Sequence, residues 1–136
     1  RNSKLKVLIV AAGITLYESL KAQELLAKEG IETIVVDCYS IKPIDSATLT
    51  KLSDKFSTIL TVEDHWSEGG LGDAVLNVFA CPSKPWRSGA AKKDVKIYKL
   101  AVTKLPHSGK PQELLDYEKI STMAIVSKIN EITKRQ

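Results

Sequence analysis

The stretch that decides the fold is Thr58–Phe79, which reads TILTVEDHWSEGGLGDAVLNVF. Its first part is apolar and β-branched, as in a strand buried inside a parallel sheet. The chain then turns polar at Glu63, Asp64 and His65, passes three glycines, and resumes with apolar residues at helical spacing. Ligands and partners of open α/β sheets lie beyond the carboxyl ends of the strands. This segment therefore predicts a functional edge, either a tight turn packed against a neighbouring domain or a helix start that holds a small anion.

Predicted strands and helices alternate along the rest of the chain. Apolar runs predict further strands near 5–10, 34–36 and 95–102, and helical spacing predicts helices over about 15–29, 45–56, 112–115 and 121–134. Cys81–Lys93, which contains two prolines, reads as a surface connection. The alternation predicts one three-layer α/β/α domain over residues 1–136, with a mainly parallel sheet.

The first predicted helix has the clearest local signals. Thr15 and Glu18 have the spacing of a capping box, and Gly30 stands where a helix commonly ends. We expect Leu16 and Leu20 on the buried face, and Glu18 on the solvent side.

Bulk properties exclude several classes of function. The 136 residues carry a net charge of +4, are 43% apolar, and contain no apolar run of membrane-spanning length. The basic residues are scattered and not interleaved with aromatic ones, which argues against nucleic-acid binding. Cys38 and Cys81 are far apart and sit beside apolar segments, so we expect free thiols in a reducing, cytoplasmic compartment. Because the sequence begins at Arg1 and has a single methionine, we expect a fragment of a longer chain.

No complete catalytic apparatus is visible. His65 and His107 both follow predicted strands and are the only histidines, so a shared metal site is conceivable, although hydrogen-bonding roles are the simpler interpretation. Glu63 needs a partner if it is buried, and Lys110, Arg87 or a neighbouring chain could supply one. We assign no catalytic residue and no metal ligand.

A second candidate for anion binding precedes a predicted short helix. Ser108, Gly109 and Lys110 could hold an anion through backbone N–H groups and the lysine, with Pro111 at the first helical position. The simpler interpretation is a satisfied turn with a solvated lysine.

Four segments together resemble the C-terminal domain of transketolase. They are Gly13–Leu20 (GITLYESL), Ile41–Asp45 (IKPID), Thr61–Gly72 (TVEDHWSEGGLG) and Ser108–Leu115 (SGKPQELL). The glycine turn is shared with the β subunits of 2-oxo acid dehydrogenases and with deoxyxylulose-phosphate synthase, whereas Glu63-Asp64-His65 combined with Ser108-Gly109-Lys110-Pro111 favours transketolase.

This resemblance implies a five-stranded sheet with one antiparallel strand. It also implies a parent enzyme, a homodimer dependent on thiamine diphosphate and Mg²⁺ or Ca²⁺, that moves a two-carbon ketol unit between sugar phosphates in the pentose phosphate pathway. The cofactor machinery of the family lies in preceding domains, so this chain is expected to serve interdomain packing and dimer assembly. The residues that the resemblance places against the rest of the enzyme are Glu63, Asp64, His65, Gly69, Gly70 and Gly72. We accordingly expect Gly70→Val to damage assembly more than folding.

Two alternatives remain from the sequence. One is a regulatory module that binds an anion or nucleotide between the Gly69–Gly72 turn and Ser108–Lys110. The other is the equivalent domain of a 2-oxo acid dehydrogenase β subunit. The segment Cys81–Lys93 departs from the family pattern and leaves the geometry there open.

Overall fold

The computed structural model describes residues 6–80 and 94–135. Within these residues the chain forms, in order, β1 (Lys6–Ala11), α1 (Ile14–Lys28), β2 (Glu32–Asp37), α2 (Ser46–Ser53), β3 (Thr58–Trp66), α3 (Leu71–Ala80), β4 (Lys96–Val102), α4 (Pro111–Tyr117) and α5 (Thr122–Lys134). The predicted surface connection over 81–93 lies outside the described residues. The predicted order of strands and helices is confirmed.

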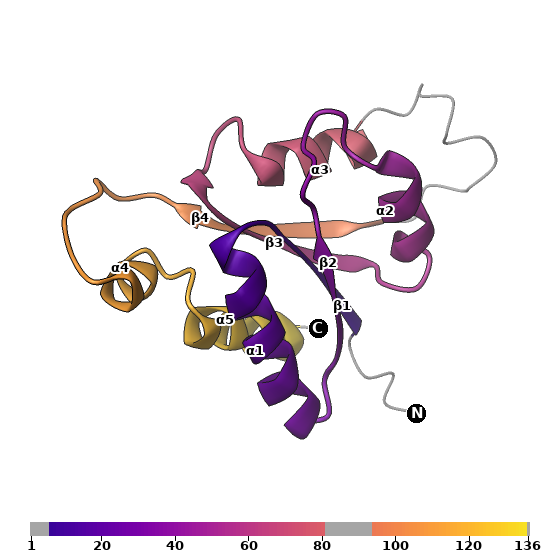
Figure 1. Ribbon diagram of the computed structural model, residues 1–136. Helices are drawn as coiled ribbons and strands as arrows, with labels where there is room; N and C mark the ends of the chain where they lie inside the picture. The colour runs from indigo at the N-terminus through magenta and orange to yellow at the C-terminus, as the bar shows by residue number, and fades with distance from the viewer. Residues whose placement is uncertain (1–5, 81–93, 136) are drawn as a thin grey trace.

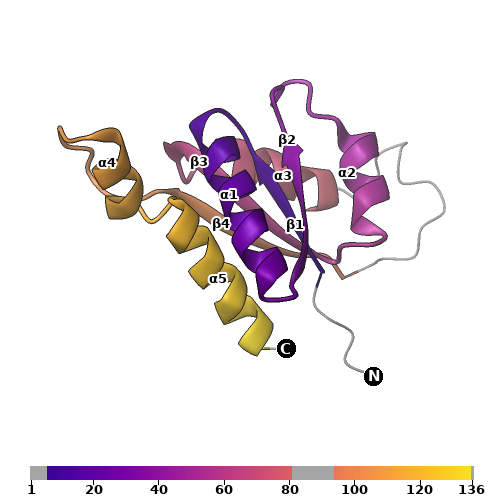
Figure 2. The same cartoon turned by 60° about the horizontal axis from the view of Figure 1, so that its bottom comes forward.

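The described sheet has four strands in the order β2-β1-β3-β4, and all its neighbours are parallel. Helices α1 and α5 cover one face of the sheet and α2 and α3 the other, as two views of the ribbon agree (Figures 1 and 2). The three-layer α/β/α architecture is therefore confirmed. Helix α4 stands apart, near the end of the sheet where β3 and β4 finish.

The expected fifth, antiparallel strand is not present among the residues that the structure describes. After β4 the chain leaves the sheet at once. The backbone N–H groups of Thr103 and Lys104 donate to a side-chain oxygen of Glu118, 3.2 and 3.3 Å away, instead of to a strand. Leu105, next along the chain, is 85% exposed.

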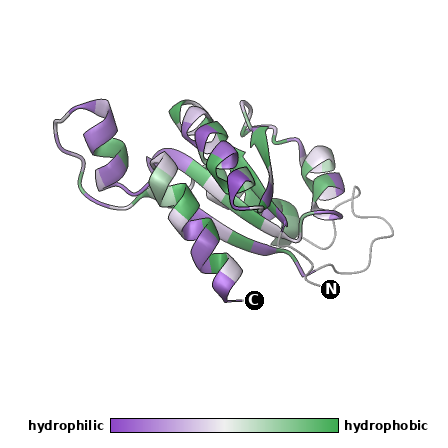
Figure 3. Ribbon diagram, turned by 90° about the horizontal axis from the view of Figure 1, so that it is seen from below, coloured by the Kyte–Doolittle hydropathy of each residue, from purple (hydrophilic) through white to green (hydrophobic). Residues whose placement is uncertain are grey.

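Two buried clusters hold the layers together. Val7, Ile9 and Ala11 of β1 pack into the cluster beneath α1 and α5, whereas Leu8 and Val10 pack into the cluster beneath α2 and α3. This alternation follows from the two-residue period of a strand, and it explains why β1 is apolar without interruption. Figure 3 shows apolar strands between helices whose outer sides are mostly hydrophilic.

Helix α1 contradicts the predicted buried face. Its buried side is formed by small and polar residues and one leucine: Thr15, Glu18, Ser19, Ala22 and Leu26. Leu20 is 42% exposed and Leu16 is only partly buried. Small side chains allow the helix to lie close to the sheet, and the Thr15 hydroxyl donates to the Val62 carbonyl 2.8 Å away.

The predicted capping box in α1 is also wrong. The N-cap is Gly13, two residues before Thr15, and Glu18 does not reach back to Thr15. Glu18 is 3% exposed, and its carboxylate accepts from the backbone N–H and the hydroxyl of Thr122 at 2.8 and 2.7 Å. Lys21 supplies a further contact at 2.9 Å. Glu18 therefore joins α1 to the start of α5.

Several local predictions are confirmed. The side chain of Asp45 accepts from the Thr48 N–H at 2.9 Å and caps α2. Gly30 follows α1 with a φ of 78°, and Pro111 begins α4. Helix α5 begins after Ser121, as its apolar spacing indicates.

Candidate functional site

Glu63 ends the buried part of β3 and points into the protein. It is 3% exposed, and its carboxylate accepts from the backbone N–H groups of Leu71 and Gly72 at 2.6 and 2.9 Å. These are orphan donors at the start of α3, where the helix dipole also favours a negative charge. The partner that Glu63 requires is thus a helix start, and neither Lys110 nor a neighbouring chain is needed to supply it; Arg87, the third candidate, lies outside the described residues.

Two glycines leave room for this carboxylate. A Cβ atom on Gly70 would overlap Glu63 Oε2 and lie 2.8 Å from His65 Nδ1. A Cβ atom on Gly72 would lie 2.9 Å from Glu63 Oε1 and 2.6 Å from Cδ of Lys99. Both glycines are buried, and the atoms that exclude a side chain at these positions belong to this domain itself.

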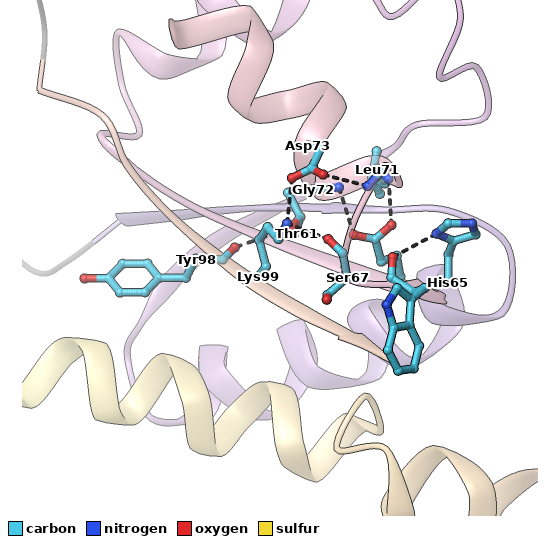
Figure 4. Close-up of polar contacts among 11 residues, drawn as sticks. Thr61, His65, Ser67, Leu71, Gly72, Asp73, Tyr98 and Lys99 are labelled. Carbon is cyan, nitrogen blue, oxygen red and sulfur yellow. Dashed lines mark hydrogen bonds and ion pairs between the residues drawn. The ribbon is translucent and has the colours of Figure 1, made fainter. Parts of the chain in front are cut away.

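An ion pair closes the same turn from the outside (Figure 4). Lys99 Nζ, from β4, donates to Asp73 at 2.7 Å and to the Ser67 carbonyl at 2.6 Å. The other oxygen of Asp73 accepts from the Gly69 N–H at 2.6 Å. The hydrogen bond from Lys99, followed by that from Gly69, holds the pKa of the Asp73 carboxyl below its ordinary value. The N–H groups of Gly69, Leu71 and Gly72 therefore all have acceptors within this domain.

The next residues of β3 face outward. Asp64 and His65 are exposed, and Trp66 is 46% exposed. His65 Nδ1 lies 2.8 Å from the Trp66 carbonyl oxygen, which can only accept, so Nδ1 carries the proton. In the neutral imidazole, Nε2 is then left as an acceptor.

These outward residues line a groove of about 560 Å³ between the ends of β3 and β4, the start of α1, and α4. Its lining is mostly apolar, and Ile14, Trp66, Val102 and Leu114 contribute to it. The sheet order places β1 beside β3, which is the position where α/β sheets of this order bind their ligands. The groove is therefore the best candidate for a functional site among the described residues.

Four polar residues also line the groove: Asp64, His65, His107 and Glu118. Glu118 Oε2 accepts from the two backbone N–H groups after β4, whereas Oε1 is buried and has no hydrogen-bond partner within the described residues. A buried acceptor without a donor is costly. One carboxylate oxygen of Glu118, a residue that lines the groove, thus lacks a hydrogen-bond donor in the described structure.

His65 and His107 do come to one place, because both line the groove. His65 also contacts the Trp66 carbonyl oxygen, and His107 packs edge-on against Tyr117, with ring centres 4.4 Å apart. No group of three or more His, Cys, Asp or Glu that could hold a metal exists in residues 6–80 and 94–135.

The predicted site residues divide into two sets. Glu63, Gly70 and Gly72 are buried within the domain, while Asp64, His65 and Gly69 are exposed. Ser108, Gly109 and Lys110 are exposed too, and the Lys110 N–H donates to Glu113 at 3.3 Å. Anion binding there stays a prediction.

A second, smaller cavity of about 390 Å³ lies at the carboxyl end of β2. Asp37, Cys38 and Tyr39 contribute to its lining. Cys38 is a buried free thiol, as predicted, and burial, followed by the charges of Asp37 and Asp45, raises its pKa. Cys81 lies outside the described residues.

Sequence reasoning missed the groove itself. It located Asp64 and His65 but gave no role to Trp66 or Glu118. An exposed tryptophan directly after a polar strand end was an available signal. Glu118 gave none, because its position depends on how α4 folds back toward β4.

The fold and the site edge correspond to one enzyme family. The family model described as "Transketolase, C-terminal domain" matches residues 1–125, and the chain belongs to this family. No helix in the described parts of the chain is long and apolar enough to cross a membrane.

Particular relatives are transketolases and transketolase-like proteins. The chain is 39% identical over 127 residues to transketolase-like protein 2 of Mus musculus and 41% identical over 130 residues to transketolase of Homo sapiens. These matches cover 93% and 91% of this chain but only 19% and 18% of those proteins. A solved structure, titled as a split gene transketolase, inactive beta4 tetramer, superposes with a TM-score of 0.79 at 30% identity, over 95% of this chain and 39% of that one.

Proposed function

We propose that this chain is the assembly domain of a transketolase, the enzyme that transfers a two-carbon ketol unit between sugar phosphates in the pentose phosphate pathway. Its role is to pack on the preceding cofactor-binding domains and to stabilise a homodimer in the cytoplasm. The single observation that carries this proposal is a largely apolar, open groove at the carboxyl edge of the sheet. It occurs in a chain that spans about a fifth of the relatives it matches.

The cofactors belong to the whole enzyme in this proposal. Thiamine diphosphate, with Mg²⁺ or Ca²⁺, supplies the carbanion chemistry of ketol transfer. The described residues do not offer a set of ligands for the divalent metal. We therefore assign no step of the reaction to a residue of this chain, whose contribution is structural.

The regulatory-module alternative is less well supported at the glycine turn. An anion there would need the N–H groups of Leu71 and Gly72, and Glu63 already occupies both. Gly69 likewise donates to Asp73. The dehydrogenase alternative is distinguished from a transketolase by the reaction that the assembled enzyme catalyses. Whether the domains lie on one chain or on two does not distinguish them, because one solved relative is a split gene transketolase.

A reconstitution experiment tests the proposal. The preceding portion of the protein, purified as a separate chain, is assayed for ketol transfer and for mass with thiamine diphosphate and Mg²⁺, with and without this chain. We expect activity or dimerisation to depend on the added chain. Full activity and a dimer without it would contradict the assembly role, and decarboxylation of a 2-oxo acid in place of ketol transfer would favour the dehydrogenase alternative.

A further inference from the structure

We propose that the groove between Trp66 and α4 is the docking site for one segment of the preceding portion of the enzyme, an apolar segment that carries a basic side chain. This inference rests on the proposed function and deepens it. The contact with the preceding portion then lies in the groove and not at the glycine turn.

The length of chain missing from this domain argues for the source of the occupant. The chain covers 19% of a transketolase-like relative and 39% of the split gene chain that shares its fold. Most of such a protein therefore lies outside the structure and must contact this domain somewhere. The glycine turn is a poor surface for that contact, because Glu63, Gly70 and Gly72 are turned inward.

The lining of the groove argues for an apolar segment. Ile14 and Trp66 are 45% and 46% exposed although both border the same hollow, and Leu114 and Val102 form part of its floor. A half-exposed tryptophan beside aliphatic residues is the kind of anchor that dominates binding energy in interfaces. The exposed Leu105 extends the apolar character beyond the groove along the chain that leaves β4.

The charges of the groove argue for one basic side chain. Asp64 is exposed at its edge, and Glu118 contributes a carboxylate whose buried Oε1 lacks a donor in the described structure. His65 and His107 are the other titratable groups that line it. An arginine or lysine could place its apolar stem against Trp66 and its cationic head near Glu118.

The test measures binding of the purified preceding portion to this chain by calorimetry and by tryptophan emission. The variant Trp86→Phe leaves Trp66 as the only tryptophan in this chain, and emission is recorded as a difference from the preceding portion alone. We expect a blue shift of the Trp66 emission on mixing. Trp66→Ala should weaken binding at least tenfold, and Glu118→Gln should weaken it about fivefold and reduce its dependence on salt.

Tyr39→Ala is the matched control. Tyr39 is a 90% exposed aromatic residue at the carboxyl end of β2, on the far edge of the sheet, and its removal should leave affinity unchanged. Circular dichroism checks that each variant is folded.

The outcomes separate the two proposals. If the portions bind and restore ketol transfer, but Trp66→Ala binds as tightly as the unaltered chain, the groove assignment is overturned while the proposed function stands. If nothing binds and no ketol transfer appears, the proposed function fails. A blue shift that depends on the concentration of this chain alone would show that a second copy fills the groove, and would overturn the occupant named above.

Discussion

Two adjacent residues of β3 belong to opposite environments. Glu63 is buried and meets two backbone donors at the start of α3, and the turn that follows is closed by Lys99 and Asp73. Asp64 begins an outward surface on which Trp66 is half-exposed, and Glu118, which lines the same groove, has a buried oxygen without a donor in the described structure. The comparison teaches that a polar strand end is not a single functional unit. Its inward side stabilises the domain, and its outward side is available to a partner.

The largest effect on this comparison should come from Gly70→Val, which the sequence led us to expect would damage assembly more than folding and which the structure predicts will damage folding itself. The new side chain would collide with the Glu63 carboxylate, so we expect the free energy of unfolding to fall by about 3 kcal/mol or more. Urea denaturation followed by circular dichroism measures it. Gly69→Asn is the control, because Gly69 has open space around it and a φ of 78°, which asparagine tolerates. Equal stability of the two variants would contradict the internal role of Gly70.

Replacing the carboxylate itself should have the next largest effect. Glu63→Gln keeps the size of the side chain but loses the charge that meets the N–H groups of Leu71 and Gly72. We expect a loss of about 2 kcal/mol in the free energy of unfolding. Asp64→Asn, one residue further on, should change it by less than about 0.5 kcal/mol. A similar loss in both variants would remove the distinction drawn here.

The buried carboxylate of Glu18 gives a further test of whether inward-facing acids stabilise the fold. Burial raises the pKa of Glu18, but the hydrogen bonds from Thr122 and Lys21 outweigh it, and the pKa lies below its ordinary 4.5. The stabilisation is therefore present above pH 4.5 and is lost as pH falls through the lowered pKa. Thr122→Val should cost about 1 kcal/mol at pH 7, and its difference from the unaltered chain should shrink in acid. Thr133→Val, which loses only a bond to the Ile129 carbonyl, should show no such pH dependence.

The smallest effect on stability should come from the groove. Trp66→Ser removes a large but half-exposed side chain, so we expect the free energy of unfolding to change by less than about 1 kcal/mol. Thermal denaturation of the isolated chain measures it. A loss as large as that of Gly70→Val would mean that Trp66 belongs to the core and is not a docking residue.

Much of the fold could be predicted because it depends on local patterns. The uninterrupted apolar run of β1 and the largely apolar first half of β3 follow from burial on two faces, and Asp45, Gly30 and Pro111 are local end signals. The buried face of α1 could not be predicted from leucine spacing. Close approach to the sheet selects Ser19 and Ala22 for that face.

The site was only half predictable for a related reason. Three of the residues named from the sequence, among them Glu63, proved to be internal, because the sequence does not tell which way a strand-end side chain turns. Glu118 contacts backbone atoms 14 and 15 residues away, which no pattern within α4 indicates. The fifth strand was inferred from the family resemblance and is absent from the described sheet.

The hydrogen bonds between α1 and α5 have a consequence for folding during synthesis. Thr122 donates to Glu18 across 104 residues, and Asn130 donates to Glu29 across 101. Closing so long a loop is slow, and Ala22 and Leu26 share their buried cluster with Ile125 and Ile129 of the last helix. During synthesis the part of this face that α5 covers therefore stays exposed until α5 has emerged. We expect a chain truncated before Thr122 to aggregate and to be recognised by chaperones, however complete its sheet.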